Sequence, residues 1–135
     1  MNVDSLGLKH HSNDHTLINK LVLLFKALSD HTRLMIIRIL ASNMKDKISV
    51  TDLSEIFSIS QPAVSQHLKI LSNIGLLDRK KEGNSVYYYV NINELNEFKI
   101  NIDEMFKFIF KKCQYFPNCV MIKSKDKKEV KKKDE

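Results

Sequence analysis

The sequence predicts a mainly α-helical domain with one small β-hairpin, in the order four helices, two strands and a last helix. Apolar residues recur at helical spacing before residue 73 and after residue 93. A short Ser-Ile-Ser segment at 58–60 separates two helical stretches, and residues 76–91 read as two strands around Glu82-Gly83-Asn84. This order of elements is typical of a winged helix-turn-helix, in which the second helix of the turn enters the DNA major groove.

The first two helices each begin at a polar residue. Asp14 is the expected N-cap of the first helix. Ser29 or Asp30 caps the second helix, which runs to about residue 43. Its stretch Leu34–Leu40, LMIIRIL, is apolar on most sides. We therefore expect the second helix to lie at the centre of the core.

The third and fourth helices flank the turn. Ser49-Val50-Thr51-Asp52 is a capping-box signature that opens the third helix. Ser60 or Gln61 caps the fourth, and Pro62 lies in its first turn, where no backbone N–H is needed. Gly75 marks the end of this helix. Leu76–Lys81 and Ser85–Asn91 are then the two strands of the hairpin.

The last helix is predicted from near Asn93 to about Cys113, and it is apolar on more than one side. One small core needs a single buried face, so the second face indicates a homodimer. The residues expected at that interface lie on the first and last helices: Leu17, Leu21, Leu24, Leu95, Phe98, Ile102, Met105 and Ile109.

The chain of 135 residues suits one domain, expected at 14–116, between a flexible N-terminus at 1–13 and a Lys-rich disordered tail at 117–135. Within the tail, the segment KSKDKKEVKKKDE has seven Lys and four acidic residues. Such a segment is either a solvated end or a non-specific DNA-binding arm. The net charge of +6 favours a polyanionic partner. No apolar run approaches about 18 residues, and no signal peptide or disulfide scaffold is evident, so we expect a cytoplasmic protein without a membrane partner.

The fourth helix carries the predicted base contacts. Val64, Leu68 and Leu71 share the inward face, and His67 at its flank is expected to be a structural hydrogen-bonder. The outward face is small and polar, which suits close approach to base edges. Cations before the hairpin turn would contact phosphate, or else protect an edge strand from aggregation. The expected DNA-binding residues are Ser60, Gln61, Pro62, Ser65, Gln66, Lys69, Arg79, Lys80, Lys81 and Asn84.

From Phe25 to Asn91 the chain resembles the ArsR/SmtB family of winged-helix repressors. The resemblance lies in the segments LSDHTR, VSQHLKIL and NSVYYYV, in the family's order. It implies a homodimer joined through the first and last helices and an inverted-repeat operator in double-stranded DNA. It also implies release by an inducer, commonly a thiophilic metal or metalloid and sometimes an oxidant or a sulfur species.

The chain departs from the sensing motifs of that family. Ser49 and Thr51 stand where arsenite- and cadmium-sensing members carry a Cys-x-Cys pair, and hydroxyls are not soft ligands. The last helix has no His beside Asp103 and Glu104, as a zinc site would require. The second helix has no Cys, so the sulfur-sensing pair is missing too.

Two candidate sensing sites remain. Cys113 and Cys119 are the only thiols, and a thiophilic metal or metalloid ion is their possible cofactor. His10, His11 and His15 are a second set of candidate ligands. The plainer alternatives are two unreactive thiols and a mobile polar N-terminus.

An enzyme is not expected, because the three glycines form no phosphate-binding loop and no catalytic triad is evident. The sequence predicts a DNA-binding transcriptional regulator, most simply an inducible homodimeric repressor. The alternatives are a constitutive repressor without a sensor and a winged-helix module that binds protein, since fold does not fix function.

Overall fold

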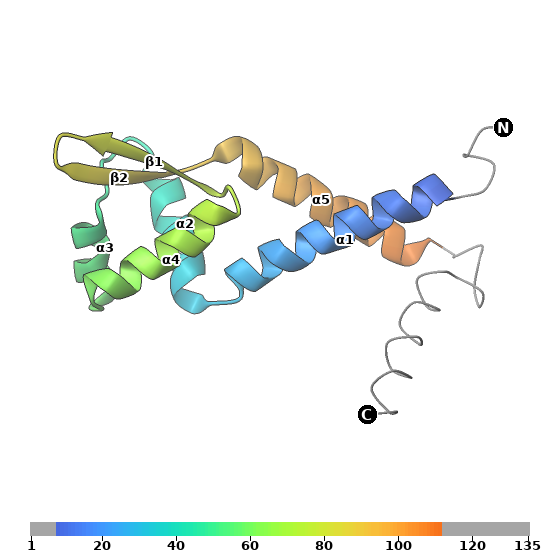
Figure 1. Cartoon of the computed structure of the whole chain (residues 1–135), viewed down its shortest axis with the longest axis horizontal. Helices are drawn as coiled ribbons and strands as arrows, with labels where there is room; N and C mark the ends of the chain where they lie inside the picture. Colours follow the sequence, from blue (N-terminus) through green and yellow to red (C-terminus); the bar gives the residue numbers. More distant parts are fainter. Residues whose placement is uncertain (1–7, 112–135) are drawn as a thin grey trace, which may run out of the picture.

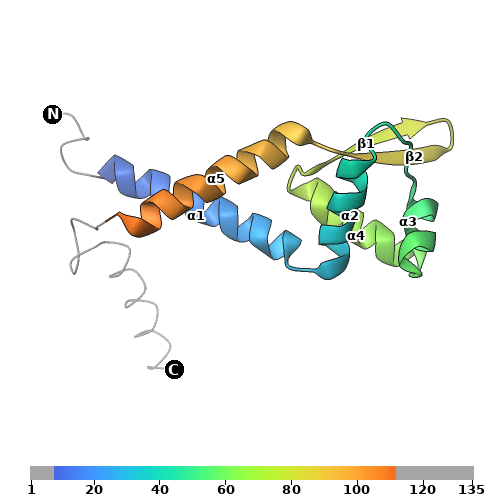
Figure 2. The ribbon, with the colours of Figure 1, turned by 180° about the vertical axis from the view of Figure 1, so that it is seen from behind.

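The computed structural model describes residues 8–111, and side chains from residue 16 onward. It confirms the predicted order of elements (Figure 1), with these bounds: α1 Leu8–Leu28, α2 His31–Ser42, α3 Val50–Phe57, α4 Gln61–Asn73, β1 Leu77–Glu82, β2 Ser85–Val90 and α5 Ile92–Phe110. Helices α2, α3 and α4 form one body with the hairpin. Helices α1 and α5 cross each other and extend away from that body (Figures 1 and 2).

The predicted caps hold three of the helices. The carboxylate of Asp30, rather than the hydroxyl of Ser29, caps α2 by accepting from the backbone N–H of Arg33 at 3.0 Å. Ser49 and Asp52 form the expected capping box at the start of α3. Ser60, rather than Gln61, caps α4.

Helix α1 begins at Leu8, so the prediction of Asp14 as its N-cap was wrong. No glycine or proline interrupts residues 8–13, and a helix continues where nothing stops it. Helix α5 ends at Phe110, before the predicted end near Cys113, because Lys111 has an extended backbone. Of the predicted flexible segment 1–13, residues 8–13 belong to α1, whereas residues 1–7 and the predicted tail 117–135 lie outside the described part and stay predictions.

The core lies where α2, α3 and α4 meet the base of the hairpin. Its fully buried side chains come from all of these elements: Ile36, Leu53, Val64, Leu68, Leu71 and Leu76. Helix α2 is less enclosed than predicted, because Leu34 is 51% exposed and only Ile36 and Leu40 are buried. Ile37, Ile39 and Ala41 are partly buried against the same cluster, and α2 contacts α1, α4 and β2, so this helix lies at the centre of the core as predicted, with one exposed side.

The hairpin pairs Leu77 with Val90 at its base and Glu82 with Ser85 at its end. The turn is thus Gly83-Asn84, and Gly83 takes a φ of +60°, a left-handed value that favours glycine. A third segment joins β2, because Ser49 bridges to Tyr87 and the N–H of Tyr88 donates to the carbonyl of Ile48 at 3.4 Å. This contact ties the start of α3 to the hairpin.

Candidate nucleic-acid interface

Helix α4 separates a buried face from a polar one. Val64, Leu68 and Leu71 have no exposed surface and hold the helix on the core. The opposite face is exposed as predicted, and it consists of Pro62, Ser65, Gln66, Lys69 and Asn73. Lys69 is its single charge, so this face presents hydroxyl and amide groups rather than the ion pairs of an ordinary solvated helix.

The first turn of α4 is also tied to α3. The hydroxyl of Ser60 accepts from the backbone N–H of Ala63 at 3.3 Å. The amide of Gln61 donates to the hydroxyl of Thr51 at 3.4 Å. Both residues are exposed beside Pro62, and each hydrogen bond also fixes the start of the helix.

Ser58 sets the angle of the turn between α3 and α4. Its backbone is left-handed, with φ 52° and ψ 42°, a conformation that costs a non-glycine residue free energy. Its backbone N–H donates to the carbonyl of Glu55. The hydroxyl of Ser54 donates to the backbone carbonyl of Ile59 at 2.5 Å. These bonds close the end of α3 and aim the chain into α4.

The β-hairpin is the wing of this fold. Its cations have two different environments, and they are Arg79, Lys80 and Lys81. By the strand register, Arg79 and Lys81 lie on one face of β1 and Lys80 on the other. Lys80 Nζ is 3.5 Å from a carboxylate oxygen of Glu82, whereas the described residues give Arg79 and Lys81 no ion pair. Among the described residues, two cations of the wing are therefore not neutralised, and the amide of Asn84 is exposed at the tip.

Glu82 is the residue that the sequence analysis missed. It binds Lys80 on its own strand and Lys47 from the α2–α3 loop, with the Lys47 Nζ to Glu82 Oε2 distance at 2.5 Å. The hydrogen bond from Lys47 lowers the pKa of the Glu82 carboxyl and raises the pKa of the Lys47 amine. Lys47 Nζ also lies 5.8 Å from the centre of the Tyr87 ring. Glu82 thus fixes the wing to the domain.

The predicted dimer residues divide by burial. Leu21 and Leu24 are 1% and 5% exposed, so their surface is already used inside the chain. Leu17, Leu95, Phe98, Ile102 and Met105 are partly buried, and Ile109 is 57% exposed. Further apolar side chains stay exposed on the same two helices: Val22, Leu23, Phe25, Ile92, Ile100, Phe106 and Phe110.

The described residues do not fit a soft metal ion. The hydroxyl of Ser49 is the helix cap of α3, and Thr51 accepts from Gln61. In α5, Asp103 is exposed and Glu104 pairs with Lys107 at 3.4 Å. No group of three His, Cys, Asp or Glu side chains in this part of the chain can hold a metal ion. Cys113, Cys119 and the side chains of His10, His11 and His15 lie outside the described residues.

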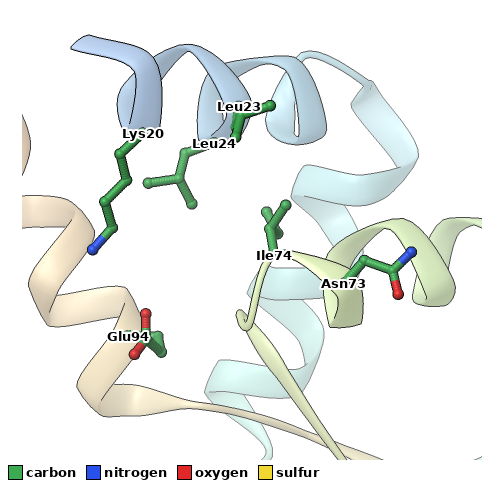
Figure 3. Close-up of a pocket in the computed structure, with 6 residues that line it drawn as sticks. All are labelled: Lys20, Leu23, Leu24, Asn73, Ile74 and Glu94. Carbon is green, nitrogen blue, oxygen red and sulfur yellow. The ribbon is translucent and has the colours of Figure 1, made fainter. Parts of the chain in front are cut away.

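A small pocket of about 160 Å³ opens where α1, the end of α4 and the start of α5 meet (Figure 3). Its floor is apolar, and Lys20 and Glu94 point into it from opposite helices. Gly75 beside it has a φ of +82°, and a β-carbon there would contact the Glu94 side chain at 3.8 Å. The pocket thus lies at the junction of α4 with α1 and α5.

Comparisons with known proteins agree with this geometry. Residues 30–79 match the family model described as "Bacterial regulatory protein, arsR family". The chain is 35% identical to the HTH-type transcriptional regulator MJ1325 of Methanocaldococcus jannaschii, over 61% of this chain and 90% of that one. It is 42% identical to the arsenical resistance operon repressor of Bacillus subtilis, over 53% of this chain and 67% of that one.

A solved structure has a similar fold. Reduced HlyU from Vibrio cholerae superimposes with a TM-score of 0.52 at 30% identity, over 76% of this chain and 98% of that one. None of the helices between residues 8 and 111 is long and apolar enough to cross a membrane. The resemblance stated from the sequence is confirmed: the chain belongs to the arsR family of bacterial regulatory proteins and is a winged helix-turn-helix, DNA-binding transcriptional regulator.

Proposed function

We propose that the chain is a homodimeric repressor that binds an inverted-repeat operator and leaves it when an inducer binds. The observation that carries the proposal is the exposed, almost uncharged face of α4 beside the unpaired cations Arg79 and Lys81. A reading helix needs short polar groups, and its flanking wing needs positive charge.

In this proposal α4 lies in the major groove and the wing lies on the adjacent backbone. Gln66 can form two hydrogen bonds to adenine, and Ser65 can bond to several bases. Residues near the N-terminus of a recognition helix make most base contacts, which favours Ser65 and Gln66 over Asn73. Arg79 and Lys81 then bind phosphates and add affinity that is independent of sequence.

The homodimer rests on the apolar side chains that one chain leaves uncovered. Val22 and Phe25 on α1 and Phe106, Ile109 and Phe110 on α5 are exposed, and exposed clusters of this kind mark interfaces. Pairing through α1 and α5 places the two copies of α4 on opposite sides of a two-fold axis. An inverted repeat has the same symmetry.

Repression and its release follow from what the chain resembles, since the similar protein of Bacillus subtilis is named as an operon repressor. We assign inducer sensing to Cys113 and Cys119, which are the only thiols in the chain and follow α5 directly. The proposal gives the chain no enzymatic reaction, and it places the protein in the cytoplasm.

The test is selection of bound DNA from a random pool by the full-length protein. We expect enrichment of a palindrome whose half-sites lie about one helical turn, roughly 10 base pairs, apart centre to centre. A footprint on that site should cover both half-sites. Equal recovery of all sequences would contradict the proposal and favour a protein-binding or architectural role.

A further inference from the structure

Three polar residues join α1, α2 and α4 at one point. Arg33, in the first turn of α2, donates through Nε to the carbonyl of Ala27 in the last turn of α1. Its Nη1 lies 3.3 Å from Nδ1 of His67, which is on α4. Asp30, the cap of α2, has a carboxylate oxygen 3.9 Å from that same His67 nitrogen. Helices α1, α2 and α4 all contact one another, and Figure 2 shows the end of α1 leading into α2 beside α4.

The Arg33 guanidinium sets a fixed separation between its two acceptors. The group is planar and rigid, so its Nε and Nη1 cannot move independently. The Ala27 carbonyl is one of the last four of α1, which no later residue of that helix can satisfy. Arg33 therefore completes the end of α1 and, with the same planar group, holds α4.

The contact requires a neutral His67. A guanidinium only donates, so His67 Nδ1 must accept, and the ring proton is then on Nε2. If Nδ1 carried a proton, it would be a donor facing the N–H donor of Arg33 Nη1. The ring would then turn so that Nδ1 donates to the carboxylate of Asp30. The backbone N–H of Arg33 lowers the pKa of Asp30, which keeps that carboxylate charged. Asp30 and Arg33 are the charged groups that contact His67 among the described residues of the helices and strands around α4.

His67 lies between a DNA-facing residue and a core residue. Gln66 before it is exposed, and Leu68 after it is fully buried. A shift of His67 would therefore rotate Ser65 and Gln66 relative to the core. The apolar contacts of Leu68 and Leu71 hold α4 in place but are not directional, whereas a hydrogen bond is.

We propose that Arg33 is a positioning residue for DNA reading, which fixes the orientation of α4 against the end of α1 through His67. This inference rests on the proposed function, in which α4 reads base edges. It also names a route of regulation: a displacement of α1 at the dimer contact would pass to Ser65 and Gln66 through one side chain.

The experiment measures affinity for the selected operator and for random DNA by fluorescence anisotropy. Arg33→Lys keeps the charge but cannot hold both acceptors, and His67→Leu removes the acceptor. We expect each to lower operator affinity about tenfold while random-DNA affinity changes less than twofold. The double variant Arg33→Lys, His67→Leu should lose no more operator affinity than the weaker-binding single variant, because both changes break the same contact. The matched control, Arg38→Lys, changes an exposed arginine of the same helix and should have no effect.

Rescue by a second acceptor distinguishes positioning from folding. His67→Gln restores an acceptor oxygen and should recover most of the operator affinity, with thermal unfolding checked for every variant. Three results would overturn the inference. They are an equal loss of affinity for operator and random DNA, a double variant whose loss equals the sum of the two single losses, and an Arg33→Lys variant that keeps its preference for the operator. A wild type without any preference would instead overturn the proposed function.

Discussion

At the scale of single residues, the cations of the wing have unequal environments. Glu82 already neutralises part of Lys80, whereas Arg79 and Lys81 have no ion pair in the described chain. Arg79→Gln and Lys81→Gln should each weaken binding to every sequence and reduce the slope of log affinity against log salt by about 1. Lys80→Gln should have a smaller effect on both. Salt titrations of all three on operator and random DNA check this, and an equal effect of Lys80→Gln would contradict it.

The exposed face of α4 gives the opposite signature. Ser65→Ala and Gln66→Ala should each cost about 1–3 kcal/mol of operator binding and leave random-DNA affinity unchanged, because they remove base contacts. Asn73→Ala, on the same face but in the last turn, is the control and should be neutral. Titrations of the three variants on both DNAs make the measurement. Similar losses on operator and random DNA would show that these side chains contact only the backbone.

At the scale of an element, the turn between α3 and α4 holds one strained and one stabilising serine. Ser58 is left-handed, so Ser58→Gly should raise the free energy of unfolding by up to about 1 kcal/mol. Ser60→Ala should lower it by about 1 kcal/mol, because the cap of α4 is lost. Urea unfolding of both variants measures the pair. A destabilised Ser58→Gly would mean that the serine makes a compensating contact.

The elements were predictable to the extent that their signals are local. Capping residues such as Asp30, Ser49 and Ser60 lie within four residues of the groups they satisfy, and each was confirmed or chosen from two neighbours. The face of α4 follows from helical spacing alone. The contacts that were missed are distant in sequence: Lys47 with Glu82, Ser49 with Tyr87, and Arg33 with His67. Spacing along the chain carries no information about them.

Helix boundaries were less predictable than helix identities. The first helix passes through its expected cap because nothing in residues 8–13 opposes a helix. Which leucines of α1 face inward was predictable, but not whether they face this chain or a second copy. Leu21 and Leu24 pack inside the chain, so the surface offered to a partner has to be read from the exposed fraction of each side chain.

For the whole molecule, the apolar outer sides of α1 and α5 predict a dimer. Sedimentation at low micromolar concentration should give about twice 15.7 kDa. Phe106→Asp should shift the protein toward monomer, since it sets a charge in the interface. The control is Ile56→Asp, an equally exposed apolar residue on α3. A wild-type monomer, or dissociation by both variants alike, would contradict this interface.

The proposed sensing also belongs to the whole molecule, because a ligand can act only by favouring one of two dimer shapes. Operator release by arsenite, cadmium and peroxide should be lost in the double variant Cys113→Ser, Cys119→Ser. An equal response of that variant would make the thiols bystanders and His10, His11 and His15 the next candidates. If arsenite, cadmium and peroxide all fail to release the wild-type protein from its operator, the protein represses constitutively with respect to these three compounds.

The packing of α1 against α5 also bears on how the chain is made. The first helix of the described chain meets its partner only after Ile92 has been synthesised, more than sixty residues after α1 ends at Leu28. At about 5–20 residues per second, the apolar side of α1 waits several seconds on the ribosome. Helices α2, α3 and α4 make contacts closer in sequence and can form during that wait, whereas the hairpin ends at Val90, just before α5 begins. The contact between α1 and α5 is therefore the last part of the described chain to be completed.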